Sequence, residues 1–271
     1  METPQKSISI ILCEGKVDAI LLGYLMQKAS DYKPSYESNS PPFALTTGAR
    51  NQVEEWYSKK TKTLDGVMHP ASDLVIVSVG SSDFSNLTSK VLRVIENQQE
   101  LSIEKLLFVA DRDAKTEDDH IIEFMNCLKI YDDKMSMNPI KIGVWFTKEV
   151  TQKSYSSAEV TTVPSVEVNI FLLPVKGIGA LETHLLDALN EKELVNLSRI
   201  FSQDGDIESF YPPKPREADA RERMKEKAAL GCTLAVLEPD QVVNKLGKRI
   251  LAIEWEKLPE LQPLLEVLHK L

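Results

Sequence analysis

The residues with the clearest chemical potential are three carboxylates, and each follows an apolar run. Glu14 comes after the run SISIILC at 7–13, and Asp111 and Asp113 come after the run KLLFVA at 105–110. Asp111 and Asp113 are two residues apart, so their side chains point to the same side if the strand conformation continues. A ligand set of oxygen atoms only, without histidine or cysteine, suits Mg²⁺ or Mn²⁺ better than zinc. The pattern predicts a divalent-metal pocket of the kind that supports phosphoryl transfer.

These carboxylates need a sheet that brings the ends of two strands together. Apolar runs predict strands at 7–12, 74–79 and 105–110, and the helical spacing of apolar residues predicts helices at 16–28 and 117–129. Alternating strands and helices favour an α/β fold, with a Rossmann-like parallel sheet flanked by helices. Ligands of such sheets bind at the carboxyl ends of the strands. If the first and third strands are neighbours, the three carboxylates converge at that edge.

The rest of the chain divides into the remainder of this core and an extension. Residues 1–150 form the expected α/β core, with an insertion at about 30–70, and residues 151–271 form an additional strand and a mainly helical C-terminal extension packed on the core. The further elements that we expect are strands at 43–46, 140–146 and 166–173, and helices at 49–60, 84–97, 181–189, 191–201, 218–237, 241–251 and 263–271.

The composition is that of an ordinary globular protein. Hydrophobic residues make up 42% and charged residues 27% of the 271 residues. This composition is typical of chains that bury a core without disulfides or structural metals. The three cysteines and four histidines are scattered, which argues against a disulfide framework and against a zinc site. No apolar run reaches the roughly 18–20 residues of a membrane span, and the start of the chain has no signal-peptide pattern. We therefore expect a cytoplasmic protein without a membrane partner.

The net charge bears on the choice of partner. The chain carries a formal charge of −9, and an acidic chain is a poor non-specific nucleic-acid binder, because phosphate binding depends on Lys, Arg and counterion release. A bound metal and a local basic groove can reverse the sign at the site itself. The charge counts against a nucleic-acid partner without excluding one.

Each candidate residue also has a purely structural interpretation. Acids at strand ends are favoured as helix caps, and for a single acid this interpretation is preferred, whereas the three acids together favour a metal site. Lys16 either neutralises a phosphate or is simply solvated. Gly80 either opens a phosphate-binding loop or belongs to an ordinary strand-to-helix turn. Gly15 permits a tight turn into the first helix.

Several of these segments together resemble the Toprim domain. The matching features are a strand that ends in Glu-Gly with an Asp soon after (EGKVDAILL), a middle strand that ends in Gly (VIVSVG), and a strand followed by Asp-x-Asp. The resemblance covers about residues 7–146, and it is greatest to the stand-alone Toprim-like proteins of uncharacterised function, which are related to the OLD-type nucleases. Two later segments also look like theirs, GIGALETHLL at 177–186 and KAALGCTLAVLEPD at 227–240.

The resemblance implies a Toprim-type fold and a role for each acid. Glu14 would act as general acid/base, and Asp111 and Asp113 would hold Mg²⁺ together with Glu14. Asp18 and Glu182 would be supporting acids. Asp18 lies one helical turn beyond Glu14 and can therefore face the same pocket. Glu182 can equally be an ordinary acid at the start of a helix.

The sequence leaves two classes of function open. The leading hypothesis is a Mg²⁺-dependent, nuclease-like protein that carries out phosphoryl transfer on nucleic acid. The alternative is a non-catalytic Toprim-like binding module or subunit for a nucleotide or a protein partner. The sequence contains no Gly-x-x-x-x-Gly-Lys-Ser/Thr motif, so an ATPase would have to be a separate subunit. Neither the oligomeric state nor the choice between DNA, RNA and a small phosphate ester follows from the residues.

Overall fold

The described part of the chain covers most of the expected core. The computed structural model describes residues 6–30, 32–34, 53–59, 63–64, 67–68, 73–78, 101–112, 115–128, 140–153, 160–175, 181–189, 192–203, 218–237 and 253–271. The expected strand at 43–46 and the expected helices at 84–97 and 241–251 lie outside these ranges.

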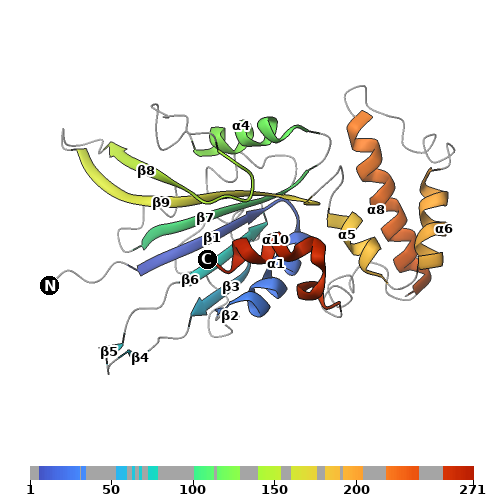
Figure 1. The fold of residues 1–271 in the computed structure, drawn as a ribbon, viewed down its shortest axis with the longest axis horizontal. Helices are drawn as coiled ribbons and strands as arrows, with labels where there is room; N and C mark the ends of the chain where they lie inside the picture. The colour runs from blue at the N-terminus through green and yellow to red at the C-terminus, as the bar shows by residue number, and fades with distance from the viewer. Residues whose placement is uncertain are drawn as a thin grey trace. The chain divides into compact units, whose positions relative to one another are not determined.

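Seven of the described strands form one sheet (Figure 1). Their order is β2 (Tyr32–Pro34), β3 (Val53–Lys59), β6 (Asp73–Ser78), β1 (Lys6–Cys13), β7 (Leu101–Asp111), β9 (Val160–Leu173) and β8 (Phe146–Lys153). β1 pairs in parallel with β6 on one side and with β7 on the other. The pairs β2–β3, β3–β6 and β8–β9 are antiparallel. The expected α/β fold is confirmed, with parallel pairing at the centre of the sheet and antiparallel pairing at both margins.

The central strands are covered on both faces. Ile8, Ile10, Ile11 and Leu12 of β1 are all 0% exposed, and successive residues of a strand point to opposite faces. Residues 106–110 of β7 are buried in the same way. Burial on both faces explains why these strands are near-continuous apolar runs, which is typical of parallel strands between helices.

The helix expected at 49–60 is wrong. Residues 53–59 form β3 instead, which pairs with β6 from Ser58 opposite Asp73 to Val53 opposite Val77. The segment contains Val, Trp and Tyr, residue types that favour strands. Pairing with a distant strand therefore outweighs the local helical spacing. The insertion expected at about 30–70 also includes two short strands, β4 (Thr63–Leu64) and β5 (Val67–Met68), which pair with each other.

The strand expected at 140–146 is wrong for most of its length. A turn contains Gly143, whose φ of 76° lies in the left-handed region that glycine adopts without strain. Its N–H donates to the carbonyl of Ile170 at 2.7 Å. The strand β8 begins only at Phe146. The strand expected at 166–173 is confirmed, but it starts earlier as β9 and belongs to the same sheet as β1.

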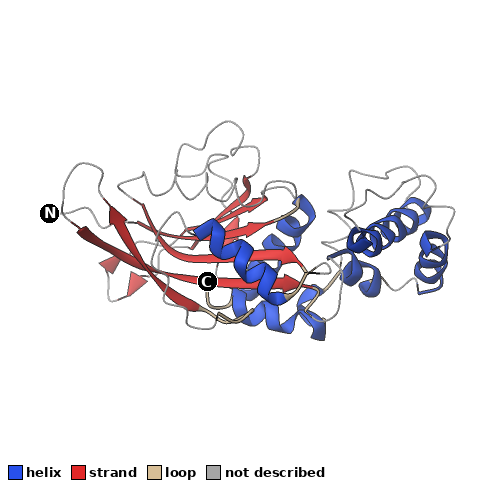
Figure 2. Cartoon of the chain, turned by 90° about the horizontal axis from the view of Figure 1, so that it is seen from above, coloured by secondary structure: helices blue, strands red, loops and turns tan. Residues whose placement is uncertain are grey.

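The chain divides into two compact units. Unit 1 comprises Met1–Val109, Glu117–Phe171 and Pro263–Leu271, and Figure 2 shows its strands as a layer with helices against it. Its helices are α1 (Lys16–Ala29), α4 (Glu117–Leu128) and nearly all of α10 (Gln262–Leu268). α1 packs against β1, β2, β3 and β6. Phe124 of α4 packs on Phe108 of β7, with ring centroids 4.9 Å apart.

Unit 2 comprises Ala110–Thr116 and Leu172–Gln262. It contains the end of β7 and a group of helices, α5 (Leu181–Ala188), α6 (Lys192–Gln203), α8 (Ala218–Leu237), η1 (Trp255–Lys257) and η2 (Pro259–Leu261). α8 has the bounds that its sequence predicted, and it packs against both α5 and α6. Within the described ranges, no helix combines the length and the apolar character that a membrane crossing requires.

Candidate functional site

Asp111 is the last residue of β7 and its carboxylate is held at the start of a helix. Its side chain is 7% exposed. Its Oδ1 accepts the backbone N–H of Leu181, the first residue of α5, at 3.3 Å. The first N–H groups of a helix have no partner inside the helix, and a negative charge there is favoured by the helix dipole. Asp111 therefore stabilises α5 from 70 residues away along the chain.

Arg112 fastens the end of β7 to the chain that follows β9. Its backbone N–H donates to the carbonyl of Leu173 at 2.6 Å. Its Nε donates to the carbonyl of Pro174 at 3.1 Å, and its Nη2 donates to the carbonyl of Val175 at 3.0 Å. One residue thus makes three hydrogen bonds to three consecutive carbonyls. In the sequence, Arg112 stands out only as a cation between Asp111 and Asp113, and this position does not predict its hydrogen-bond partners.

Asp18 and Gly15 form the start of α1. Asp18 is 9% exposed, and its Oδ2 accepts the N–H of Gly15 at 2.7 Å. Gly15 is extended, with a φ of −122°, so no left-handed turn is present. A Cβ at this position would lie 3.3 Å from Asp18 Oδ2, which is tighter than an ordinary contact. The glycine is therefore favoured by the closeness of the capping carboxylate.

The other candidate residues are placed only in part. Glu14 lies between β1 and α1 and is partly exposed. Lys16 is the first residue of α1, and its side chain is not among those described. Glu182 is in the first turn of α5, next to the residue whose N–H meets Asp111. Asp113 and Gly80 lie outside the described residues.

The strand register relates the two acidic segments. β1 and β7 are parallel neighbours, and Cys13 of β1 pairs with Val109 of β7. Glu14 follows Cys13 directly, and Asp111 comes two residues after Val109. Among the residues that the structure describes, no group of three or more His, Cys, Asp or Glu side chains is arranged to hold a metal. That set does not include Asp113, one of the three expected ligands.

The sequence patterns did not single out His184 of α5. It is 8% exposed, and its Nε2 has no hydrogen-bond partner among the described residues. Burial lowers the pKa of His184, and the charges of Asp187 and Glu260 oppose that shift. Burial favours the neutral form of a histidine, because removing the imidazolium from water is costly. No sequence spacing marks it, because its burial depends on how unit 2 folds.

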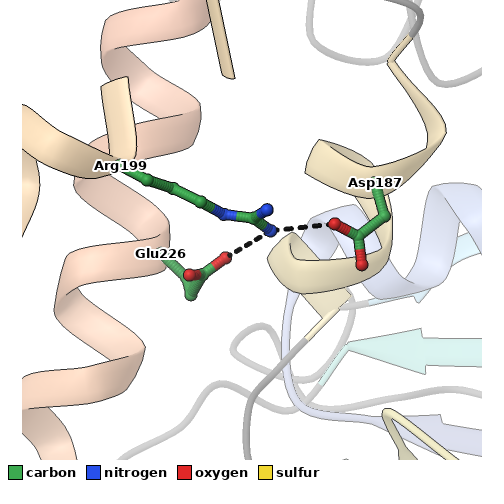
Figure 3. A network of polar contacts seen from close by, with 3 residues as sticks. All are labelled: Asp187, Arg199 and Glu226. Atoms are coloured by element: carbon green, nitrogen blue, oxygen red, sulfur yellow. Dashed lines mark hydrogen bonds and ion pairs between the residues drawn. The ribbon is translucent and has the colours of Figure 1, made fainter. Parts of the chain in front are cut away.

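An ion-pair network joins the three longer helices of unit 2 (Figure 3). Arg199 of α6 donates from Nη2 to Asp187 of α5 at 2.9 Å and to Glu226 of α8 at 3.3 Å. The side chains of Arg199 and Glu226 are partly buried, whereas that of Asp187 is exposed. The network is structural, since it ties helices together and leaves the Arg199 guanidinium directed at two carboxylates.

Comparisons with known proteins add one likeness. No family model matches the chain, and no curated protein matches it. Among solved structures, the chain is similar to the crystal structure of a hypothetical protein from Pyrococcus horikoshii OT3, at 15% identity and a TM-score of 0.42. The match covers 97% of this chain and 99% of that one. A likeness at this level carries no argument about function.

Proposed function

We propose that the chain is a Mg²⁺- or Mn²⁺-dependent, nuclease-like Toprim protein of the cytoplasm that carries out phosphoryl transfer on nucleic acid. The observation that supports this most is the parallel register of β1 and β7, with Cys13 paired to Val109. Parallel strands end at the same edge of a sheet, where ligands of α/β proteins bind. Glu14 and Asp111 each follow that last pair within two residues.

The residues fit a hard divalent cation. The expected ligands Glu14, Asp111 and Asp113 offer only oxygen, the donor that Mg²⁺ and Mn²⁺ prefer. The carboxylate of Asp111 is buried and accepts the N–H of Leu181, and metal-binding carboxylates are ordinarily held by such a bond. The bound cation would supply charge neutralisation at a phosphate oxygen.

The other residues take supporting roles in this proposal. Glu14 would move the proton of the attacking water, for which its partial exposure gives access. Lys16 would neutralise a phosphate, and Gly80 would offer a backbone N–H group to it. Glu182 would support the site from the first turn of α5. Asp18 holds the start of α1, and hence the turn that carries Glu14, through its bond to Gly15.

A cleavage assay tests this function. Labelled single-stranded and duplex DNA and RNA are incubated with the protein in Mg²⁺, in Mn²⁺ and in EDTA. We expect metal-dependent cleavage of at least one substrate, reduced about 100-fold or more in Glu14→Gln, because general acid–base groups contribute rates of that order. Asp118→Asn is the matched control, since Asp118 is an exposed acid of α4, and it should retain full activity. Equal activity of Glu14→Gln and Asp118→Asn would contradict the assigned role of Glu14.

A non-catalytic module is the second candidate, and two observations favour it. Asp111 already has a structural task, because its carboxylate bonds to the start of α5. The net charge of −9 also disfavours a nucleic-acid partner in the absence of metal. Such a module, or a subunit beside a separate ATPase, would bind a nucleotide or a protein equally well after Glu14→Gln. Absence of cleavage on every substrate, together with retained partner binding in Glu14→Gln, would favour this alternative.

A further inference from the structure

We propose that Arg112 is a positioning residue that sets the orientation of Asp111 for metal binding. The inference rests on the proposed function and concerns residues of unit 2 alone. Arg112 follows Asp111 directly in the chain. Both side chains are engaged with the same stretch of unit 2, Arg112 with the carbonyls of Pro174 and Val175 and Asp111 with the N–H of Leu181.

The hydrogen bonds of Arg112 fix the backbone from which Asp111 projects. The backbone N–H of Arg112 bonds to Leu173 at 2.6 Å, so the peptide plane between Asp111 and Arg112 is held by its own donor. The guanidinium then bonds to the next two carbonyls, at 3.1 and 3.0 Å. Hydrogen bonds from a charged donor are roughly twice as strong as neutral ones. The peptide that joins Asp111 to Arg112 is thus held by its own N–H, and the Arg112 side chain is bonded at two further points, which restricts the backbone from which the Asp111 carboxylate projects.

The chemistry of the guanidinium explains why arginine serves here. Nε and Nη2 are separate donors in a rigid planar fork, so one side chain can reach the carbonyls of Pro174 and Val175 together. A lysine ammonium is a single point on a flexible stem and cannot reproduce that geometry. Because these donors are directed at backbone carbonyls, we assign Arg112 to orienting Asp111.

Manganese binding tests the inference without any substrate. Free Mn²⁺ is followed by electron paramagnetic resonance while the metal alone is titrated into wild type, Asp111→Asn, Arg112→Met and Arg112→Lys. We expect Arg112→Met to weaken Mn²⁺ binding by about 10-fold or more, as for other residues that orient metal ligands. Arg112→Lys should fall between Arg112→Met and wild type.

Arg199→Met is the matched control, because it removes a different arginine of unit 2 and breaks the network with Asp187 and Glu226. It should lower stability and leave Mn²⁺ affinity unchanged. Hydrogen exchange of peptides covering 110–116 gives a second readout that needs no metal. Exchange there should be faster in Arg112→Met than in Arg199→Met.

The outcomes separate this inference from the proposed function. Wild type that binds no Mn²⁺ would overturn both. Wild type that binds Mn²⁺, with binding lost in Asp111→Asn and unchanged in Arg112→Met, would overturn the role of Arg112 alone. Equal weakening in Arg112→Met and Arg199→Met would show an effect of general stability and would also overturn it. If Arg112→Met does not fold, Arg112→Lys decides by the same comparison.

Discussion

Asp18 and Asp111 are buried carboxylates, and each accepts a backbone N–H at the start of a helix. The bond of Asp18 closes a local turn, since Gly15 is three residues away. The bond of Asp111 reaches Leu181, which is 70 residues away. The bond of Asp18 is a capping bond, and an acid in the first turn stabilises its own helix. Asp111 does more, since it links the end of a sheet strand to a helix that follows much later.

The burial of His184 predicts that the stability of unit 2 depends on pH. Burial lowers its pKa below the ordinary value of 6.5, although Asp187 on its own helix and Glu260 of η2 oppose this. Other charged groups on these helices form ion pairs. Arg199 pairs with Asp187 and with Glu226. The unfolded chain therefore binds a proton at higher pH than the folded chain does. Stability should be unaffected above the unfolded pKa and should fall as the pH drops from 6.5 toward the lower folded pKa.

Urea unfolding at pH 7.5 and 5.5 measures this effect in wild type and in His184→Gln. We expect the free energy of unfolding of wild type to fall more between the two conditions than that of the variant, which lacks the titrating group. An equal loss in both proteins would show that other groups account for the pH dependence.

At the scale of elements, α10 closes the core of unit 1. Leu264 and Leu268 are 0% exposed, and the Lys105 ammonium of β7 donates to the carbonyl of Lys270, just beyond the helix. Lys105 also lies 3.6 Å from the carboxylate of Glu167 on β9. The C-terminal segment of unit 1 thus contacts a strand that lies far earlier in the chain.

Leu268→Ala should therefore destabilise unit 1 strongly. Truncating a fully buried leucine removes apolar contacts and leaves a cavity, with a cost of about 2–5 kcal/mol. Ile122→Ala on α4 is the matched control, since Ile122 is 59% exposed in the same unit and its change should stay within about 0.5 kcal/mol. Denaturant unfolding followed by circular dichroism measures both. Similar small losses in the two variants would mean that α10 is not part of the cooperative core.

The elements also show which features the sequence could predict. β1 and β7 were predictable, because their near-continuous apolar runs reflect burial on both faces of the sheet. The bounds of α8 were also predicted from the sequence. β3 was not, since its strand conformation depends on pairing with β6, about 20 residues away. The partners of Arg112 were equally hidden, because Pro174 and Val175 lie 62 and 63 residues from it. Long-range hydrogen bonds leave no mark in a local pattern.

At the scale of the whole molecule, unit 2 interrupts unit 1 in the chain. Residues Leu172–Gln262 belong to unit 2, and the chain returns to unit 1 at Pro263. The short segment Ala110–Thr116 also belongs to unit 2. The candidate acids are divided accordingly, with Glu14 in unit 1 and Asp111 in unit 2.

Calorimetric titration of Mg²⁺ and Mn²⁺ tests directly whether Asp111 and Asp113 bind a divalent metal. Wild type is compared with the double variant Asp111→Ala/Asp113→Ala, and circular dichroism verifies that both proteins are folded. We expect saturable binding in wild type that disappears in the double variant, because the proposed function assigns both carboxylates as metal ligands. Binding that is unchanged in the double variant, or absent from wild type both alone and with a phosphodiester oligonucleotide present to complete the coordination of the metal, would contradict it.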